Sequence, residues 1–170
     1  MDALKRWLEP FDEEDFDVYD EAYGDTCSLA AEALGEIGDT RAVELLIEAL
    51  GDGEGPGSWS AATALGKIGD TDAVEPLIWV LRQNRPSEAV REEAAWALGK
   101  IGDTDAVNPL IGLLRHKHYD MRRAAAMALV EFGEQTVEPL IKMLDDDYFP
   151  SNPGRPDIVA DGMWTLGEIG

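Results

Sequence analysis

A ten-residue stretch, LGKIGDTDAV, occurs twice in this chain, at residues 65–74 and 98–107, and a close relative, LGEIGDTRAV, occupies 34–43. Before each copy lies an alanine-rich pattern such as AATALGKIG, and after it a second pattern such as AVEPLIWVL. The shared leucine recurs at 34, 65, 98, 129 and 166. A period of this length, built from two helical patterns, predicts helical hairpins stacked into a rod.

The turn within the repeat, GDT, has the composition of a joint between two helices. Glycine adopts the left-handed conformation that ends a helix at low cost. The Asp-Thr pair that follows offers side-chain oxygens to the free N–H groups of the next helix. Three prolines, Pro76, Pro109 and Pro139, fall in the first turn of that helix, where a missing N–H costs little. The repeated stretch is therefore interpreted as structural and not as an active site.

The alanine-rich helix carries a buried stripe at fixed positions. Counted from the shared leucine as zero, positions −4, 0 and +3 are apolar in most units, as in Ala61, Leu65 and Ile68. This spacing is that of one helix face turned to the core. The second pattern also forms a helix, and MDALKRWLEP at the start of the chain is a degenerate copy of it.

Composition limits the class of protein. An apolar share of 45% is too high for a disordered chain. No apolar run is long enough to span a membrane, and no signal peptide is evident, so we expect a cytoplasmic location. The net charge of −21 opposes binding to nucleic acid or to anionic membranes. It suits a partner with a basic surface, a salt-rich cytoplasm or solubility, and composition does not separate these.

The unit AAxALGxIGD…AVxPLI resembles the short HEAT repeats of the phycobilisome-lyase type over nearly all of residues 25–170. The resemblance implies an all-α fold, a right-handed α-solenoid of about five HEAT-like hairpins that forms a single domain over 1–170. The repeats are expected near 1–38, 39–69, 70–102, 103–133 and 134–170. In the fourth unit, LVEFGEQTVEP replaces the glycine by Val130 and shortens the turn, which should change the rotation between helices there.

Positions −6, −5, −2 and +2 of the alanine-rich helices vary freely, and the resemblance implies that they line a concave face. Three tryptophans and a methionine lie there among charged residues, as in protein-binding hot spots. The predicted partner-binding residues are Trp59, Thr63, Lys67, Glu92, Glu93, Trp96, Lys100, Arg123, Met127, Glu131, Asp161, Trp164 and Glu168. The alternative is that some of these aromatics pack on a neighbouring repeat or loop. Trp79, on the other helix type, is expected to be half-exposed.

Two segments, 11–26 and 145–157, lengthen the connections at one edge of the rod. They are expected either to shape the groove or to cap the core. Cys27 is placed at the start of a helix, as a partly buried packing residue. His116 and His118 are placed in a solvated loop without metal.

The sequence offers no catalytic constellation, and we expect no metal, no cofactor and no enzymatic activity of its own. The favoured function is an adaptor that binds another protein. The alternative, implied only by the resemblance, is a bilin lyase subunit acting on a phycobiliprotein or its tetrapyrrole. Because the chain stops at LGEIG, where other units continue, we also expect it to be part of a longer array or to self-associate through its last repeat.

Overall fold

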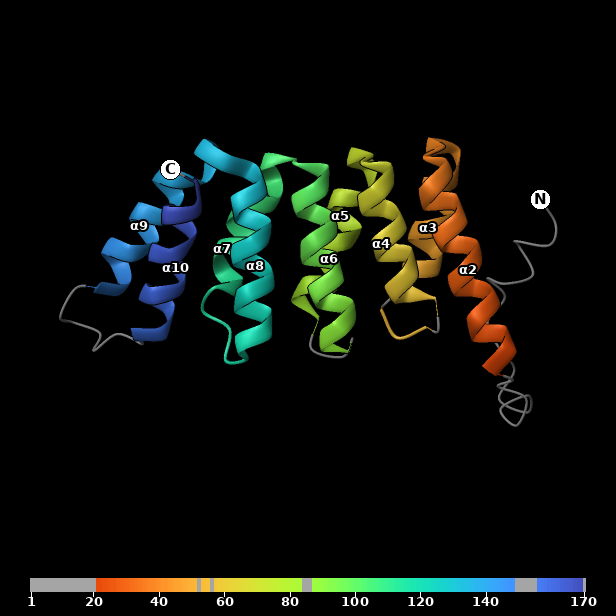
Figure 1. The fold of residues 1–170 in the computed structure, drawn as a ribbon, viewed down its shortest axis with the longest axis horizontal. Helices are drawn as coiled ribbons and strands as arrows, with labels where there is room; N and C mark the ends of the chain where they lie inside the picture. Colours follow the sequence, from red (N-terminus) through yellow and green to blue (C-terminus); the bar gives the residue numbers. More distant parts are fainter. Residues whose placement is uncertain (1–20, 52, 56, 84–86, 149–155, 170) are drawn as a thin grey trace.

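The helices form two layers, as the computed structural model of the protein shows (Figure 1). It describes residues 21–51, 53–55, 57–83, 87–148 and 156–169. The front layer consists of α2 (Glu21–Ile37), α4 (Ser58–Ile68), α6 (Glu88–Ile101), α8 (Tyr119–Phe132) and α10 (Pro156–Ile169). The back layer consists of α3 (Val43–Leu50), α5 (Val74–Arg82), α7 (Val107–Leu113) and α9 (Val137–Tyr148). The described residues contain no strand, and the predicted all-α solenoid is confirmed.

Short 3₁₀ turns connect each front helix to the back helix that follows it: η2 (Thr40–Ala42), η3 (Thr71–Ala73), η4 (Thr104–Ala106) and η5 (Gly133–Thr136). At the first three of these joints, the glycine of GDT has the predicted left-handed backbone. These are Gly38, Gly69 and Gly102, with φ of 70°, 75° and 74°. Because a side chain at this φ is strained, the joint depends on glycine.

The aspartate of GDT caps the 3₁₀ turn, and the α-helix proper begins after that turn. Asp39 accepts the backbone N–H of Arg41 at 2.9 Å, and Asp70 and Asp103 each accept the equivalent N–H at 3.0 Å. The predicted capping by aspartate is confirmed. The guanidinium of Arg41 also bonds the carboxylate of Asp39 and lowers its pKa to about 2. The three prolines are each the third residue of a back-layer helix, as expected.

The core lies between the two layers. Leu65, Leu98 and Leu129 at position zero of the front helices are fully buried, and so are Leu77 and Leu110 of the back helices. Aliphatic side chains that leave water in this way supply the main favourable free energy of folding. The predicted core stripe is confirmed at positions −4 and 0 of α4, α6 and α8, whereas Ile37, at position +3 of α2, is 70% exposed.

Adjacent front helices approach closely at a glycine. A Cβ placed on Gly66 would lie 2.7 Å from Cα of Ala97, and one on Gly99 would lie 3.0 Å from Cα of Ala128. The front helices α2, α4, α6 and α8 therefore pack directly on each other, whereas α3, α5 and α7 barely contact one another. The front layer is therefore more tightly packed along the array than the back layer.

Three of the expected boundaries were wrong. α2 begins at Glu21, so part of the expected insertion 11–26 is helical, and Cys27 lies well inside the helix instead of at its start. α9 continues to Tyr148 and α10 begins at Pro156, so both ends of the expected insertion 145–157 are also helical. Residues 1–20 and 149–155, which carry the rest of these insertions and the expected N-terminal helix, lie outside the described residues. Within the described part, no helix has the length and apolarity needed to cross a bilayer.

Candidate partner-binding face

The exposed side of the front layer presents three rows of side chains that cross the helices. The loop-side row, at position −6, lies toward the loops that lead into the front helices, at the end opposite the 3₁₀ turns. It contains Ser28, Trp59, Glu92, Arg123 and Ala160. The middle row, at position −2, contains Glu32, Thr63, Trp96, Met127 and Trp164. The turn-side row, at position +2, contains Glu36, Lys67, Lys100, Glu131 and Glu168. Because successive rows are four residues apart on each helix, they are separated by about 6 Å along the helix axis.

Large aromatic side chains lie exposed on these rows. Trp59, Trp96 and Trp164 are 50%, 40% and 49% exposed, and Met127 is half-buried. Trp79, on the back layer, is 46% exposed, as expected. The exposed indoles of the front layer therefore do not lie in the core.

Side chains at position −5 lie beside the three rows and are buried or half-buried in most of the described repeats. Ser60 and Ala124 are buried, and Glu93 and Asp161 are half-buried. These side chains point to the neighbouring front helix because the helices are so closely spaced. Only Leu29, on α2, is exposed at this position among the described repeats, at 64%.

The turn-side row is organised by ion pairs. Lys67 lies 2.7 Å from Glu36, and Lys100 lies 3.1 Å from Glu131. The hydrogen bond and charge of Lys67 lower the pKa of Glu36, and Glu36 in turn raises the pKa of Lys67. The ammonium group of Lys100 also lies 4.8 Å from the ring centroid of Trp96. Each lysine is thus drawn toward an outer neighbour.

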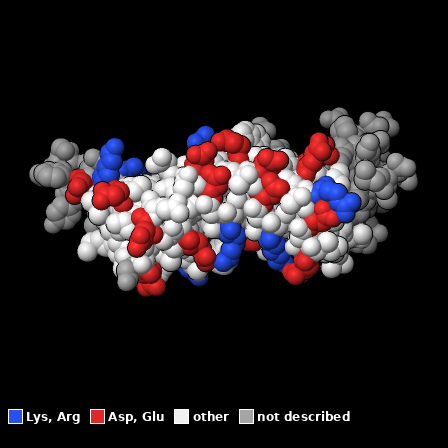
Figure 2. Space-filling model, turned by 90° about the horizontal axis from the view of Figure 1, so that it is seen from above, with Lys and Arg blue, Asp and Glu red and all other residues white. Residues whose placement is uncertain are grey.

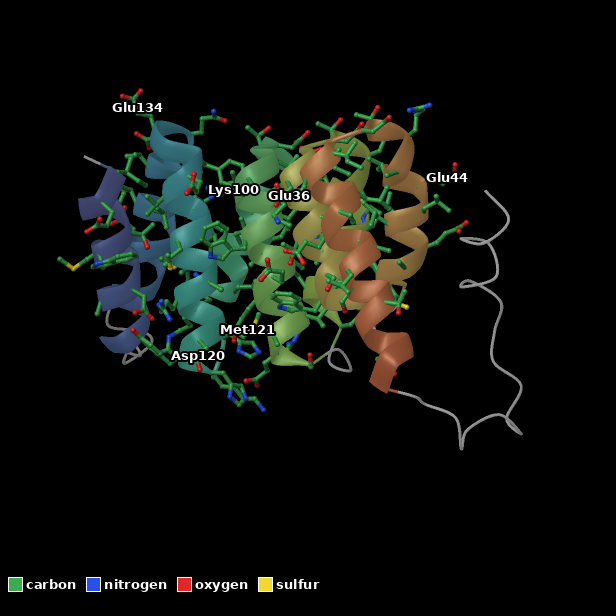
Figure 3. The ribbon with its side chains drawn as sticks, turned by 45° about the vertical axis from the view of Figure 1, so that its right-hand side comes forward. Glu36, Glu44, Lys100, Asp120, Met121 and Glu134 are labelled. Atoms are coloured by element: carbon green, nitrogen blue, oxygen red, sulfur yellow. The ribbon has the colours of Figure 1, made fainter. Side chains whose placement is uncertain are left out.

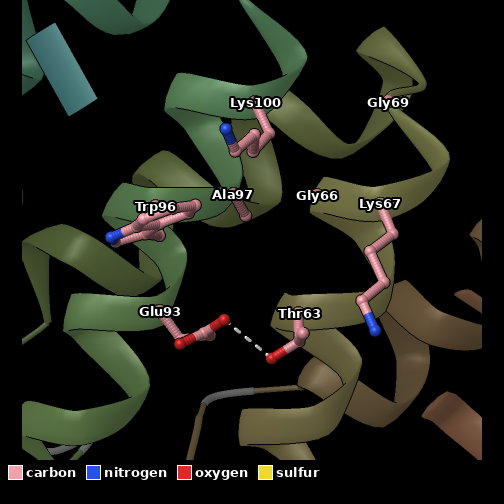
Figure 4. A pocket seen from close by; sticks show the side chains of 8 residues that line it. All are labelled: Thr63, Gly66, Lys67, Gly69, Glu93, Trp96, Ala97 and Lys100. Atoms are coloured by element: carbon pink, nitrogen blue, oxygen red, sulfur yellow. Dashed lines mark hydrogen bonds between the residues drawn. The ribbon is translucent and has the colours of Figure 1, made fainter. Parts of the chain in front are cut away.

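A pocket of about 440 Å³ lies between α4 and α6 (Figure 4). Its lining residues are Thr63, Gly66, Lys67, Gly69, Glu93, Trp96, Ala97 and Lys100. Gly66 and Ala97, where the two helices touch, lie between its walls. The pocket is open because the two lysines, which repel each other, turn to Glu36 and Glu131 instead of filling the gap.

A hydrogen bond closes the loop side of this pocket. The hydroxyl of Thr63 donates to Oε1 of Glu93 at 2.8 Å and lies 3.1 Å from the backbone carbonyl of Trp59. It ties α4 to α6 across the pocket (Figure 4). The indole of Trp96 forms the opposite wall, so the pocket combines an aromatic side with polar ends.

Carboxylates crowd the loop end of α6 and α8. Burial raises the pKa of the Glu92 carboxyl, and the neighbouring charges of Asp120 and Glu88 raise it further. Arg123 and Arg91 act in the opposite direction and do not cancel the rise. Asp120 lies at the loop end of the molecule and Lys100 nearer the turn end (Figure 3). The face therefore changes from acidic to aromatic to mixed along the axis of α6.

The turn end of the molecule also carries many carboxylates. Seen from this end, acidic side chains lie at many places along the described part of the array, and basic side chains lie at fewer places (Figure 2). This agrees with the net charge of −21. A partner approaching this protein thus meets a negative potential from most directions.

Two features of the face could not be predicted from the sequence: the contacts made by His116 and His118, and the pocket between α4 and α6. Nε2 of His118 lies 3.2 Å from Glu88, and the rings of His116 and His118 are 5.4 Å apart. Burial and the charge of Arg91 lower the pKa of His116. Glu88 and Asp120 were also missed, although acidic residues in the first turn of a helix were a usable signal.

The structure changes the description of Cys27. Burial raises the pKa of the Cys27 thiol. A cysteine at the N-terminus of a helix can be reactive because its pKa is lowered there, but Cys27 lies well inside α2, where this effect does not apply. The prediction that Cys27 is partly buried is confirmed. In the ranges that the structure describes, no three His, Cys, Asp or Glu side chains are grouped to hold a metal ion.

Comparisons with known proteins agree with this architecture. The sequence model of HEAT repeats matches residues 20–84 and 74–150. The fold is similar to a solved structure, the complex of CpcE and CpcF of phycocyanin lyase from Nostoc sp. PCC7120, with 30% identity and a TM-score of 0.55. The match covers 75% of this chain and 53% of that chain, so this chain spans about half the length of its neighbour. No curated protein matches the sequence.

Proposed function

This chain belongs to the HEAT-repeat family, and we propose that it is a non-catalytic scaffold that binds a partner protein through the exposed side of its front layer. The observation that carries the proposal is the exposure of Trp59, Trp96 and Trp164 on one face, beside the pocket between α4 and α6. Aromatic side chains with half of their surface in water are enriched where proteins bind each other.

The architecture supports binding at low entropic cost. The tryptophans stand on helices held by the Gly–Ala contacts, such as Gly66 with Ala97, so little order has to be gained on binding. The surrounding charges, including Glu92 and Lys100, can select the partner and its orientation. Asp161 has a different role, because it is engaged by the buried Arg122 at 2.6 Å and holds α10 on α8.

The structural neighbour supports a protein as the partner. It is a complex of CpcE and CpcF, and the similarity covers 75% of this chain. By analogy, a second protein chain is one class of partner for this face. Self-association is a further candidate at α10, where Met163 is 63% and Trp164 49% exposed.

A bilin lyase subunit is the second candidate function, and it rests on the similarity to the phycocyanin lyase complex. Trp96 and the pocket beside it would then contact a tetrapyrrole or a phycobiliprotein. The pigment has strong visible absorbance, so a coloured complex distinguishes this function from a colourless adaptor.

The test is affinity capture from lysate of the source organism with visible absorbance recorded on the eluate. The tagged chain is compared with a Trp59→Ala/Trp96→Ala/Trp164→Ala variant. Trp79→Ala is the matched control, because Trp79 is exposed to a similar degree on the back layer. Circular dichroism and thermal unfolding establish that each variant is folded.

We expect a partner that the native chain and Trp79→Ala retain and that the triple variant loses. A colourless partner supports the scaffold, and a bilin-coloured eluate supports the lyase subunit. If the folded triple variant retains every partner, binding through the front face is wrong.

A further inference from the structure

We propose that the segment bound by this face is a cationic amphipathic α-helix of the partner protein. Its apolar side chains contact Trp96 and enter the pocket between α4 and α6, and its basic side chains lie over Glu88, Glu92 and Asp120. The inference rests on the proposed function and adds the chemistry of the partner.

The loop end of the face carries a cluster of three carboxylates, Glu88, Glu92 and Asp120. Burial raises the pKa of Glu92 most, and the charges of Asp120 and Glu88 lie close enough to raise it further. The neighbouring cations are Arg123, which is exposed, and Arg91, which is buried beneath the face. A lysine or arginine from a partner would relieve this repulsion, whereas an acidic partner would add to it.

Histidines border the same cluster. His118 lies 3.2 Å from Glu88, and His116 lies beside it. The acidic cluster and the two histidines therefore lie together at the loop end of α6 and α8.

Trp96 and the pocket beside it form an apolar anchor site next to the acidic cluster. Trp96 is one helical turn from Glu92 on the same side of α6 and is 40% exposed. The pocket beside it reaches down to Gly66 and Ala97, which have no long side chains to fill it. On an α-helix, residues four apart are also separated by about 6 Å, so one apolar and one basic side chain would reach Trp96 and Glu92 together.

The face also limits which backbone conformation of the partner it can bind. An extended segment needs hydrogen bonds for its own N–H and C=O groups, whereas a helix satisfies them internally. Apart from the hydroxyls of Ser28 and Thr63, the three rows of the face contain no side chain that both donates to and accepts from a peptide backbone. The front helices use their own backbone groups internally, and the face is therefore better suited to a helix.

The lysines of the turn-side row do not favour an acidic partner. Lys67 pairs with Glu36 and Lys100 with Glu131, so their charges are compensated within the face. Their aliphatic stems can cover the apolar side of a bound helix while the ammonium groups remain in water.

The experiment uses two synthetic peptides of about 18 residues, long enough as a helix to run the length of α6 beside the pocket. Both have a leucine stripe, and the flanking positions are lysine in one peptide and glutamate in the other. Binding is measured by calorimetry and by tryptophan fluorescence at several salt concentrations. The variants are Glu88→Gln/Glu92→Gln/Asp120→Asn, Trp96→Ala and a control triple, Glu44→Gln/Glu75→Gln/Glu138→Gln.

The control triple removes the same net charge from exposed positions of the back layer. We expect the lysine peptide to bind and the glutamate peptide not to bind. The loop-end triple and Trp96→Ala should each weaken binding of the lysine peptide about tenfold or more, and the control triple by less than about threefold.

Equal losses in both triples would show attraction to net charge alone and would overturn the inference. Preference for the glutamate peptide, lost in Lys67→Gln/Lys100→Gln, would overturn it in favour of an acidic partner. The Trp59→Ala/Trp96→Ala/Trp164→Ala variant separates the two proposals. If this variant loses its lysate partner but the native chain binds the lysine and glutamate peptides equally, the scaffold function stands and the cationic helix is wrong. If the tryptophan triple keeps every partner, the scaffold function itself fails.

Discussion

The contact between α6 and α8 and the contact between α8 and α10 join equivalent helices by different means. In the first, Gly99 lies against Ala128 so closely that an added Cβ would be 3.0 Å from Cα of Ala128. In the second, Val130 and Thr165 occupy the positions of the glycine and the alanine. α8 and α10 contact each other less extensively than the other neighbouring front helices do. Larger side chains at this position thus hold the backbones apart.

An ion pair is present where the close backbone contact is absent. Nε of Arg122 donates to Asp161 of α10 at 2.6 Å, and Nη1 donates to the carbonyls of His116 and Lys117 at 3.2 and 3.3 Å. At the α6–α8 contact, Arg91 has the position of Arg122, but Ala124 has the position of Asp161. The Nε of Arg91 is buried without a hydrogen-bond partner. Substitutions that give one helix contact the residues of the other therefore test which side chains stabilise each contact.

The largest effect is expected from Gly66→Val, which gives the α4–α6 contact the residue type found at Val130. A Cβ at residue 66 would lie 2.7 Å from Cα of Ala97, so the two helices would have to separate. We expect a loss of about 3 kcal/mol or more in the free energy of unfolding. Chemical denaturation with circular dichroism measures it.

Gly112→Ala is the control for this substitution. Gly112 lies within α7, and nothing lies within 4 Å of a Cβ added there. Alanine is the better helix former, so this variant should gain about 0.5–1 kcal/mol. A Gly66→Val variant as stable as the native chain would show that the close approach is not required.

The next effect is expected from Asp161→Ala, which makes the α8–α10 contact resemble the α6–α8 contact. The Arg122 side chain is 8% exposed and would lose its carboxylate while keeping its two carbonyl acceptors. We expect a loss of about 2 kcal/mol, less than for a fully buried pair because Asp161 is partly exposed. Hydrogen exchange should rise most in α10, and a loss spread evenly over all helices would contradict a local role.

The features predicted well from the sequence are those that recur in every repeat. Leu65 and Leu98 in the core and the Gly-Asp joints at 69 and 102 each appear in several copies, so the pattern separates them from residues that vary by chance. The exposure of Trp96 and Trp164 also followed from their distance from the core positions on the helix.

The features that the sequence missed depend on contacts between repeats. Arg122 and Asp161 are 39 residues apart, and their pairing depends on how closely α8 and α10 pack. The pocket depends on the directions of Lys67 and Lys100, which follow from ion pairs with residues 31 positions away in each case. Cys27 was misplaced because Gly24, Asp25 and Thr26 before it have the composition of the GDT joint, whereas here they lie within α2.

A gain in stability is expected from Ala124→Asp, which supplies Arg91 with the carboxylate that Arg122 has. The new carboxylate can accept from the buried Nε of Arg91, now without a partner. We expect about 1 kcal/mol of added stability, since a charged hydrogen bond replaces an unsatisfied buried donor. Ala124→Asn has a similar shape without the charge and should gain less. A loss of stability in Ala124→Asp larger than in Ala124→Asn would show that Arg91 does not reach this position.

The smallest effect is expected from Glu92→Gln, which removes a charge at the α6–α8 contact. In α10 the equivalent position, −6, is occupied by the uncharged Ala160. The pKa of Glu92 is raised in the folded chain by burial and by Asp120 and Glu88, so its ionised form is destabilising. Glutamine should add a few tenths of a kcal/mol at pH 7. Because the folded state binds this proton more tightly than the unfolded state does, the native chain loses stability as the pH rises through the raised pKa.

The pH dependence of the Glu92→Gln effect separates repulsion from packing. The stability difference between the variant and the native chain should be largest at pH 7 and should vanish as the pH falls below the pKa of an unperturbed glutamate, where Glu92 is protonated in both states. A difference that stays constant over this range would be a packing effect. The same substitution should weaken binding of the lysine peptide, so a gain in stability accompanied by a loss of binding would identify Glu92 as a residue kept for its partner.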